Sequence, residues 1–396
     1  MKVAHITTID ISLRYLLLNQ LQSIQQAGYK VIGISSPGSE VPFIEAAGIR
    51  HISVGMSRNP FTPFQDLRAL WQLYRIFRRE HFTIVHTHTP KPGFLGQIAA
   101  KIAGVPIIVN TLHGFYFHDH MHPALRRFYI TLEKIAAHCS DVILSQNRED
   151  IETAIHEGIC SPDKIKHLGN GIDVRRFNPA RFSPRDIARK RLEVGLPDGS
   201  RVVGFVGRLV QEKGLLELFA AARIVRERVP NVQFLFIGPV DTHKPDALTP
   251  DSAQEYGIVE ICHFLGMRQD MPELYALMDV FILPSHREGF PRAPMEASAM
   301  KVPSVVTNIR GCREAVEDGR NGIIVPLGDV QALADAIVEL LTDREKARRM
   351  GEEGRHIALE RFDEQLVFEK VKLEYARLLT EKGLSVPKPE NKLYEK

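Results

Sequence analysis

Short apolar runs alternate with amphipathic stretches along most of the chain, and these runs are rich in valine and isoleucine. They do not alternate strictly between apolar and polar residues, which is typical of strands buried on both faces of a sheet. In the first half, the predicted strands are residues 3–7, 31–35, 51–54, 84–87, 107–110, 142–145 and 165–168. Helical stretches separate many of them, so the pattern predicts parallel βαβ units in a doubly wound sheet.

The pattern breaks near residue 171 and restarts near residue 201. The intervening stretch is charged and contains Asn-Pro, Ser-Pro and Pro-Asp-Gly, which are typical of a linker. Later predicted strands are residues 202–206, 232–237, 280–283, 304–307 and 323–325, and the last long helix is residues 362–379. The predicted fold class is therefore α/β, with two doubly wound Rossmann-like domains facing each other across a cleft. Its expected parts are a first domain (1–172), a linker (173–200), a second domain (201–360), and a C-terminal helix and tail (361–396) that packs back on the first domain.

Composition fits two ordinary domains, since the chain has 396 residues. A net charge of only +3 gives no case for nucleic acid as a partner. The four cysteines are far apart without a Cys-x-x-Cys pair, which argues against a zinc knuckle and a disulfide framework. No apolar run reaches the roughly 18 residues of a membrane helix, and the N-terminus resembles a strand more than a secretory signal. A cytoplasmic location is expected.

The first 172 residues hold 17 Lys and Arg against 13 Asp and Glu, and 12 of the 16 histidines. The remainder of the chain is close to neutral. A mildly cationic, histidine-rich first half suits an anionic acceptor or a membrane surface.

Residues 204–214 read Gly-Phe-Val-Gly-Arg-Leu-Val-Gln-Glu-Lys-Gly and open the second domain. Arg208 is expected at the carboxyl end of a strand and Lys213 in the first turn of a helix. Ligands of open parallel sheets bind at that edge, and a helix N-terminus favours anions. Two fixed cations there suggest a diphosphate site. The alternative is a solvated surface lysine that Glu212 merely screens.

Residues 285–297 form a second strand–loop–helix segment, with Pro291 near the first helical position. The backbone N–H groups around Gly289 and Phe290 are suited to cradle a phosphate. Carboxylates at Glu288 and Glu296 are natural acceptors for pairs of sugar or ribose hydroxyls. The alternative for Glu296 is a weak i, i+4 ion pair with its neighbour one helical turn earlier.

Together the two segments resemble the C-terminal domain of family 4 glycosyltransferases, which have the GT-B fold. The Gly-Arg-Leu…Lys-Gly element, the Glu-x7-Glu element of Glu288 and Glu296, and Leu-Gly-Asn-Gly-Ile-Asp at 168–173 all match, in the family's order. The resemblance covers nearly the whole chain.

The resemblance implies a retaining sugar transfer from a nucleotide diphosphate sugar, with a UDP-sugar expected, and with neither a metal nor another cofactor. The absence of any Asp-x-Asp agrees with the last point. It implies that Arg208 and Lys213 hold the diphosphate and stabilise the departing nucleotide. Glu288 would contact the transferred sugar and Glu296 the ribose. The remaining implied donor contacts are Gly289, Phe290 and Pro291 at the phosphates, and Gly266 and Met267 near the base.

In the first domain, His113 ends a predicted strand and precedes a glycine. It matches the His-Gly that the family places against the transferred sugar, although it could simply close the strand. The turn at residues 7–11 lacks the glycines that many members have there. The role of this turn is left open.

The segment at residues 86–93 resembles the branch that builds capsule, O-antigen and related glycans on polyprenyl-diphosphate carriers. This implies a glycan or lipid-linked sugar as the acceptor, with His86, His88 and Lys91 as candidates to meet its phosphate. Turn-forming proline and glycine explain much of the segment without a function.

His118, Asp119, His120 and His122 resemble a metal cluster, but alternate histidines in one loop close a tetrahedral site poorly. We expect an acceptor-side loop that includes His118, and no metal. Apolar stripes follow at residues 125–135 and precede it at residues 67–77. Each stripe, with arginines beside it, fits either ordinary core packing or peripheral contact with the cytosolic membrane face.

Two alternatives to sugar transfer remain. A nucleotide-sugar epimerase of the same fold would use a similar diphosphate cleft without an acceptor. A non-catalytic sugar-nucleotide-binding protein would bind the donor without turnover.

Overall fold

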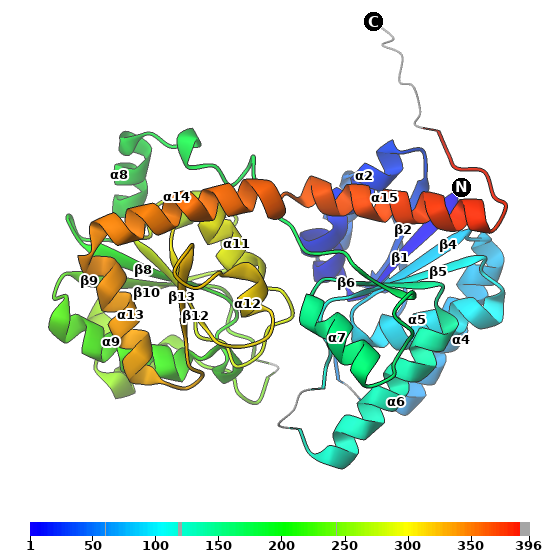
Figure 1. The fold of residues 1–396 in the computed structure, drawn as a ribbon, viewed down its shortest axis with the longest axis horizontal. Coiled ribbons are helices and arrows are strands. Elements are labelled where there is room, and N and C mark those ends of the chain that lie inside the picture. Colours follow the sequence, from blue (N-terminus) through cyan, green and yellow to red (C-terminus); the bar gives the residue numbers. More distant parts are fainter. Residues whose placement is uncertain (60, 118–120, 243, 389–396) are drawn as a thin grey trace, which may run out of the picture. The chain divides into compact units, whose positions relative to one another are not determined.

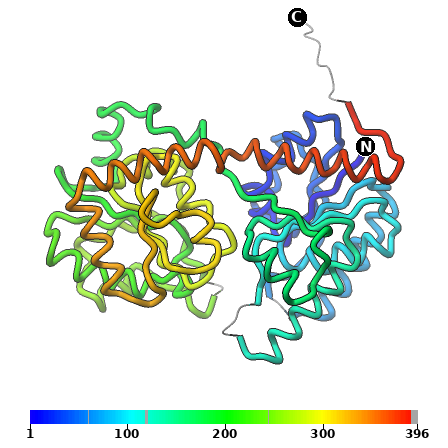
Figure 2. The backbone as a smooth tube through the Cα atoms, in the orientation of Figure 1, coloured from blue at the N-terminus to red at the C-terminus, as the bar shows by residue number. Residues whose placement is uncertain are grey.

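The computed structural model describes residues 1–59, 61–117, 121–242 and 244–388. The chain forms two compact units (Figure 1, Figure 2). Unit 1 contains Met1–Gly169 together with the segment that begins at Val367, and unit 2 contains Asn170–Leu366. Each unit is an α/β layer structure built on one parallel sheet.

The sheet of unit 1 has seven parallel strands in the order β3-β2-β1-β4-β5-β6-β7. Its strands are β1 Lys2–Ile9, β2 Lys30–Ser36, β3 Arg50–Ser53, β4 Ile84–His88, β5 Ile107–Leu112, β6 Val142–Ser145 and β7 Ile165–His167. All seven predicted strands are present. The strand order reverses between β1 and β4, which is where ligands of doubly wound sheets usually bind, beyond the strand carboxyl ends.

The helices of unit 1 cover both faces of this sheet. They are α1 Asp10–Ser12, the π-helical turn Leu13–Leu17, α2 Leu18–Gln26, α3 Val41–Ala46, α4 Pro63–Glu80, α5 Pro90–Ala103, α6 Pro123–Cys139, α7 Arg148–His156 and α15 Glu364–Glu381. The apolar stripe of α15 packs with Leu13, Leu21 and Val109 on one face, and α4 and α5 pack on the other. The last helix therefore belongs to the core of unit 1.

The sheet of unit 2 has six parallel strands in the order β10-β9-β8-β11-β12-β13. They are β8 Arg201–Val206, β9 Val232–Ile237, β10 Cys262–Gly266, β11 Val280–Leu283, β12 Ser304–Thr307 and β13 Gly322–Val325. The sequence pattern predicts five of them and misses β10. This strand lies at the sheet edge with partly exposed side chains, so it lacks the continuous apolar run of a buried strand.

Helices cover both faces of this second sheet as well (Figure 1). The α-helices of unit 2 are α8 Pro184–Glu193, α9 Leu215–Arg228, α10 Met271–Tyr275, α11 Arg292–Ala299, α12 Cys312–Ala315, α13 Val330–Thr342 and α14 Arg344–Arg361. Its 3-10 turns are Pro179–Arg181, Gln211–Lys213, Pro250–Tyr256 and Val259–Ile261.

The prediction of a linker at 173–200 is wrong, because this stretch is part of unit 2. Phe177, Val194 and Leu196 are buried in its core. Its turn-rich composition reflects the start of α8, where Ser183 and Asp186 form a capping box. Three buried apolar side chains hold this polar segment against unit 2. Their spacing shows neither the helical nor the strand periodicity that a sequence pattern would reveal.

The chain passes from unit 1 to unit 2 at Gly169–Asn170 and returns at Leu366–Val367, and hydrogen bonds join the segments at these two points. The Ile172 N–H donates to the Phe362 carbonyl at 2.8 Å, and the Glu364 N–H donates to the Ile172 carbonyl at 3.0 Å. Gly171 directly precedes Ile172, and a Cβ there would be 2.6 Å from the Glu364 Cα. Only glycine fits without a backbone shift.

We expect Gly171→Ala to lower the free energy of unfolding of unit 2 by about 2–4 kcal/mol, because its methyl group meets backbone rather than a flexible side chain. Urea unfolding of the full-length chain measures the effect. The control is Gly55→Ala, where a Cβ meets nothing within 4 Å. Equal stability of the two variants would contradict the proposed close approach.

Candidate functional site

The loop after β8 carries the two predicted cations. Arg208 follows the strand, and Lys213 closes the 3-10 turn Gln211–Lys213. Gly214, with φ of 71°, then starts α9, so Lys213 precedes the helix rather than standing in its first turn as predicted. A Cβ on Gly214 would be 1.9 Å from the Pro284 carbonyl oxygen. The loops after β8 and β11 are therefore in backbone contact.

Glu288, in the loop after β11, accepts hydrogen bonds from both loops. Lys213 Nζ donates to its Oε1 at 2.5 Å, and the Ser285 hydroxyl donates to the same oxygen at 2.7 Å. The side chains of Lys213 and Glu288 are only 17% and 11% exposed. Two residues predicted from separate motifs thus form one partly desolvated ion pair at the carboxyl edge of the sheet.

Arg208 is anchored by a carboxylate that the sequence analysis did not select. Its NH1 group donates to Asp241 Oδ2 at 2.7 Å, and the Asp241 side chain is only 7% exposed. Asp241 stands four residues beyond β9, and this position beyond a strand end was the available signal. A guanidinium has five N–H donors and an ammonium three, so neither carboxylate uses all the donors of its cation.

The backbone after Glu288 is held on two sides. The Phe290 carbonyl accepts from the Asn170 amide at 2.9 Å, and a Cβ on Gly311 would be 2.3 Å from the Gly289 carbonyl oxygen. Pro291 is the N-cap residue of the eight-residue helix α11. Asn170 gives the Gly-Asn-Gly-Ile-Asp motif a structural task, because it fixes the loop that carries Glu288.

Glu296 lies in α11 and is partly buried, and it accepts from the Tyr275 hydroxyl at 3.0 Å. Desolvation raises the pKa of this carboxyl, while the charge of Arg292 and the Tyr275 hydrogen bond act in the opposite direction. The Arg292 guanidinium lies 3.7 Å from Glu364. An oriented carboxylate with a raised pKa is suited to accept hydroxyl hydrogen bonds.

The predicted base-contact residues stand at the end of β10. The Gly266 carbonyl accepts from the Gly238 N–H at 2.9 Å, and Met267 is 58% exposed. Both lie at the same carboxyl edge as the loops after β8 and β11, since all strands of this sheet are parallel.

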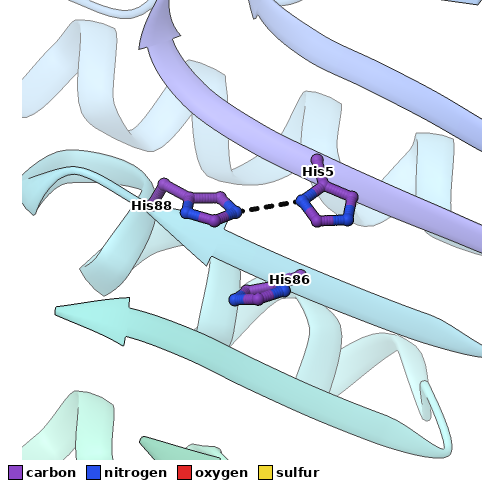
Figure 3. A group of neighbouring side chains, drawn as sticks. All are labelled: His5, His86 and His88. Atoms are coloured by element: carbon purple, nitrogen blue, oxygen red, sulfur yellow. Dashed lines mark hydrogen bonds between the residues drawn. The ribbon is translucent and has the colours of Figure 1, made fainter. Parts of the chain in front are cut away.

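In unit 1, the side chains of His86 and His88 lie beside that of His5 (Figure 3). They are 0% and 1% exposed, and each of their ring nitrogens has a protein partner. The assignment of these two side chains as acceptor ligands is therefore corrected. They lie on β4, where every residue is buried, so their ring nitrogens had to find internal partners.

His88 connects this buried group to His113. His88 Nδ1 lies 3.2 Å from His113 Nε2, and His113 Nδ1 lies 3.1 Å from Gln146 Oε1. Burial lowers the pKa of His113 to about 4 and that of His5 to about 3. Burial and neighbouring histidine charges keep the pKa values of His86 and His88 well below the usual range. All four rings are neutral at pH 7.

His5, His86 and His88 offer nitrogen atoms that all lie within 4.8 Å of one another, a spacing compatible with a metal ion. Every one of these nitrogens, however, already lies within hydrogen-bond distance of another side chain. We therefore interpret the group as a hydrogen-bonded chain rather than a metal centre.

Lys91 forms an internal ion pair, with Nζ 2.5 Å from Asp66 Oδ1 in α4. Nearby Thr89 has a φ of 63°, which is strained for a β-branched residue. Its hydroxyl lies 3.0 Å from that of Thr8 and accepts from the Thr8 N–H. The side chain of Thr89 thus holds the backbone at the end of β1, where this chain lacks the glycines that many family members have. His118 lies outside the described residues.

The two apolar stripes prove to be only partly core. In α4, Phe77 is buried, but Leu67 and Trp71 are 66% and 56% exposed. In α6, Leu125 and Phe128 are 45% and 47% exposed. None of the described helices combines the length and apolar character needed to cross a bilayer.

Comparison with known proteins identifies both halves of the chain. The family described as "Glycosyl transferases group 1" matches residues 186–357, and "Glycosyltransferase Family 4" matches residues 15–176. The chain is 34% identical over 282 residues to UDP-Gal:alpha-D-GlcNAc-diphosphoundecaprenol alpha-1,3-galactosyltransferase of Escherichia coli, covering 71% of this chain and 72% of that protein. It is 30% identical over 389 residues to the capsular polysaccharide biosynthesis glycosyltransferase CapM of Staphylococcus aureus, covering 96% and 98%.

Anabaena Alr3699/HepE, solved in complex with UDP and glucose, superposes with a TM-score of 0.80 at 22% identity, covering 95% of this chain and 100% of that one. This likeness, with the two parallel sheets, confirms the predicted fold class of two Rossmann-like GT-B domains.

The buried neutral histidines predict an acid-sensitive fold. A histidine whose folded pKa lies below the unfolded value of about 6.5 takes up a proton on unfolding, so its stabilisation is lost as the pH falls below that value. As the pH falls from 7.5 to 5.5, each of His5, His86 and His88 should lower the free energy of unfolding by about 1.4 kcal/mol. Urea titrations at the two pH values measure the difference.

His5→Gln removes one such group and should reduce this pH-dependent loss by about 1.4 kcal/mol. The matched control His156→Gln replaces a histidine whose side chain is 86% exposed, and it should leave the loss unchanged. An unaltered pH dependence in His5→Gln would show that this ring titrates normally in the folded chain.

Proposed function

The chain belongs to the group 1 and family 4 glycosyltransferases, and from that premise we propose that it transfers a sugar from a UDP-sugar to a polyprenyl-diphosphate-linked acceptor. The proposed transfer retains the anomeric configuration and uses no metal. The acceptor hydroxyl oxygen forms the new glycosidic bond as the bond from the anomeric carbon to the diphosphate breaks. The hydroxyl proton leaves with the nucleotide or to solvent.

The observation that carries this proposal is the ion pair of Lys213 and Glu288 where two loops touch at the carboxyl edge of unit 2. Arg208 stands in the same loop as Lys213 and remains 34% exposed. An arriving diphosphate brings its own negative charge to these two cations. They would stabilise the departing nucleotide as charge develops, which is the role of magnesium in other transferases.

Glu288 is freed to bind sugar hydroxyls when the diphosphate takes over Lys213. Its Oε1 is held by the Ser285 hydroxyl, which keeps the carboxylate oriented during that exchange. Glu296 would bind the ribose, with Tyr275 fixing its orientation. The backbone of Gly289, Phe290 and Pro291 would line the phosphates.

Relatives support the donor and the acceptor class. The name of the Escherichia coli relative specifies a UDP-sugar donor and a diphosphoundecaprenol-linked acceptor, and the Anabaena structure holds UDP and glucose. A GT-B epimerase or a non-catalytic binder would differ from a transferase in one measurable respect. Only a transferase releases UDP in proportion to added acceptor.

We expect Lys213→Ala to keep the fold and to lose about 30- to 1,000-fold in turnover, because a cation lost from a diphosphate site costs roughly 2–4 kcal/mol of transition-state stabilisation. Acceptor-dependent release of UDP measures this, with GDP- and ADP-sugars tested as alternative donors.

Lys346→Ala is the control, since it removes another lysine ion pair, with Glu339, far along the chain from the motifs. It should turn over within twofold of the parent chain. Near-normal turnover of Lys213→Ala would remove this lysine from the donor site and the main support for the proposal.

We also propose that unit 1 contacts the inner face of the cell membrane through the α4 apolar surface, which we define as Phe61, Phe64, Leu67 and Trp71. These side chains are 77%, 91%, 66% and 56% exposed. Arg75 stacks on the Trp71 ring at 4.6 Å. Exposed apolar side chains beside arginines are typical of helices that lie in the interface of anionic membranes.

Trp71 is the single tryptophan of the chain and therefore reports this contact directly. Its fluorescence should shift to the blue with vesicles that contain anionic phospholipid, and much less with zwitterionic vesicles. Phe64→Ser should reduce the bound fraction several-fold, because it removes apolar area from the interface. Leu192→Ser in α8, at a side chain 73% exposed, is the matched control. An unshifted spectrum on anionic vesicles would exclude this surface.

A further inference from the structure

Seven side chains of unit 1 form a continuous hydrogen-bonded chain that ends at His113 and Gln146 (part in Figure 3). The successive contacts are Thr111 Oγ1–His86 Nε2 (2.7 Å), His86 Nδ1–Tyr375 Oη (2.7 Å), Tyr375 Oη–His5 Nε2 (3.2 Å), His5 Nδ1–His88 Nε2 (3.0 Å), His88 Nδ1–His113 Nε2 (3.2 Å) and His113 Nδ1–Gln146 Oε1 (3.1 Å). The members come from β1, β4, β5, α15 and the segments that follow β5 and β6.

The direction of this chain can be read from the Gln146 end, and Tyr375, which has one O–H to donate, supports the same direction from the other end. A carboxamide oxygen can only accept, so His113 must carry its proton on Nδ1 and leave Nε2 as an acceptor. His88 must then donate from Nδ1, and the same reasoning passes to His5. Tyr375 donates to His5 and accepts from His86, which accepts from the Thr111 hydroxyl.

The number of available protons matches the number of contacts when all four histidine rings are neutral. Six contacts need six protons, and two hydroxyls and four neutral imidazoles supply six. An additional proton on any ring would require the Thr111 hydroxyl to turn from donor to acceptor and every contact between Thr111 and the protonated ring to reverse. Neutral rings thus satisfy all six contacts, and burial disfavours a charged ring.

We propose that Tyr375 and the three buried histidines are positioning residues that hold His113 as a neutral Nδ1–H donor at the carboxyl end of β5. His113 then acts at the transferred sugar as a hydrogen-bond donor and not as a general base, because the lone pair on its Nε2 already accepts the hydrogen bond from His88 Nδ1. Gln146 is the resident acceptor that a sugar hydroxyl would replace or share. This rests on the proposed function, and the place of the transferred sugar at His113 is the one that the family resemblance implies.

Tyr375 lies on α15, 370 residues from His5 in the sequence, so this helix takes part directly in the hydrogen-bonded chain that ends at His113. α15 is pinned beside it by Lys166, whose Nζ lies 2.8 Å from Glu374. Removing the Tyr375 hydroxyl would split the chain without touching His113.

The first test is the tautomer of each ring in the parent chain, which needs neither substrate nor variant. Two-bond correlations between carbon-bound hydrogens and nitrogen in protein labelled with ¹⁵N-histidine distinguish Nδ1–H from Nε2–H. We expect His5, His86, His88 and His113 to be single Nδ1–H tautomers at pH 7.5. An Nε2–H or a doubly protonated ring at His113 would overturn the proposal.

The second test compares Tyr375→Phe with Tyr29→Phe. Tyr29 is also buried and contacts the Tyr375 ring edge-on, with ring centroids 5.8 Å apart, but it is not a member of the hydrogen-bonded chain. We expect Tyr375→Phe to add an Nε2–H population at His88 and His113 and to lower kcat about 3- to 30-fold. The donor KM should stay within twofold, and Tyr29→Phe should match the parent chain in both respects.

The outcomes separate the two proposals. A parent chain that releases no UDP with any acceptor contradicts the proposed function, while the tautomers still decide the state of His113. A working parent chain whose Tyr375→Phe variant keeps kcat and one His113 tautomer contradicts the positioning role alone.

Discussion

Polar groups removed from water must find partners inside the protein, and this constraint shapes both units. In unit 2 it pairs Lys213 with Glu288 and Arg208 with Asp241. In unit 1 it links four histidines into one chain with Tyr375. A parallel sheet with helices on both faces leaves no solvent near its strand centres. Every polar side chain placed there therefore needs a neighbouring side chain or backbone group as its hydrogen-bond partner. Both candidate sites consist of such internally paired polar side chains near strand carboxyl ends.

The charge balance of the proposed donor site follows from the same constraint. Two cations left alone in a partly desolvated loop would repel each other and stay hydrated, whereas two carboxylates hold them in place at little net charge. A diphosphate can then replace contacts that already exist, and reorganisation on binding is small. The arrangement is consistent with transfer without a metal, because the fixed cations are already where the leaving group's charge would develop.

The sequence predicts strands well and polar partnerships poorly, for a physical reason. Buried strands such as β4 and β11 carry runs of valine, isoleucine or phenylalanine that are visible locally. The linker prediction was wrong because Phe177 and Leu196 dock without periodicity. His86 resembled a cleft ligand because a histidine near a strand end looks the same whether it points out or in. Its partner Tyr375 lies 289 residues away, and no local pattern encodes that contact. In unit 2, Lys213 and Glu288 were found separately, but their pairing was not.

The loop after β11, which carries Glu288, shows how these contacts extend to the points where the chain enters and leaves unit 2. Asn170, at the first residue of the unit, holds the Phe290 carbonyl. Phe362, near the last, packs edge-on against the Phe290 ring with centroids 6.1 Å apart. The bonds between Ile172 and residues Phe362 and Glu364 tie these two braces together. The backbone that follows Glu288 is thus fixed by both connecting segments, and a disturbance at either should be felt at the carboxylate that meets Lys213. The Gly-Asn-Gly-Ile-Asp motif therefore supports the proposed donor site through the backbone that it holds, although none of its side chains is expected to touch the sugar.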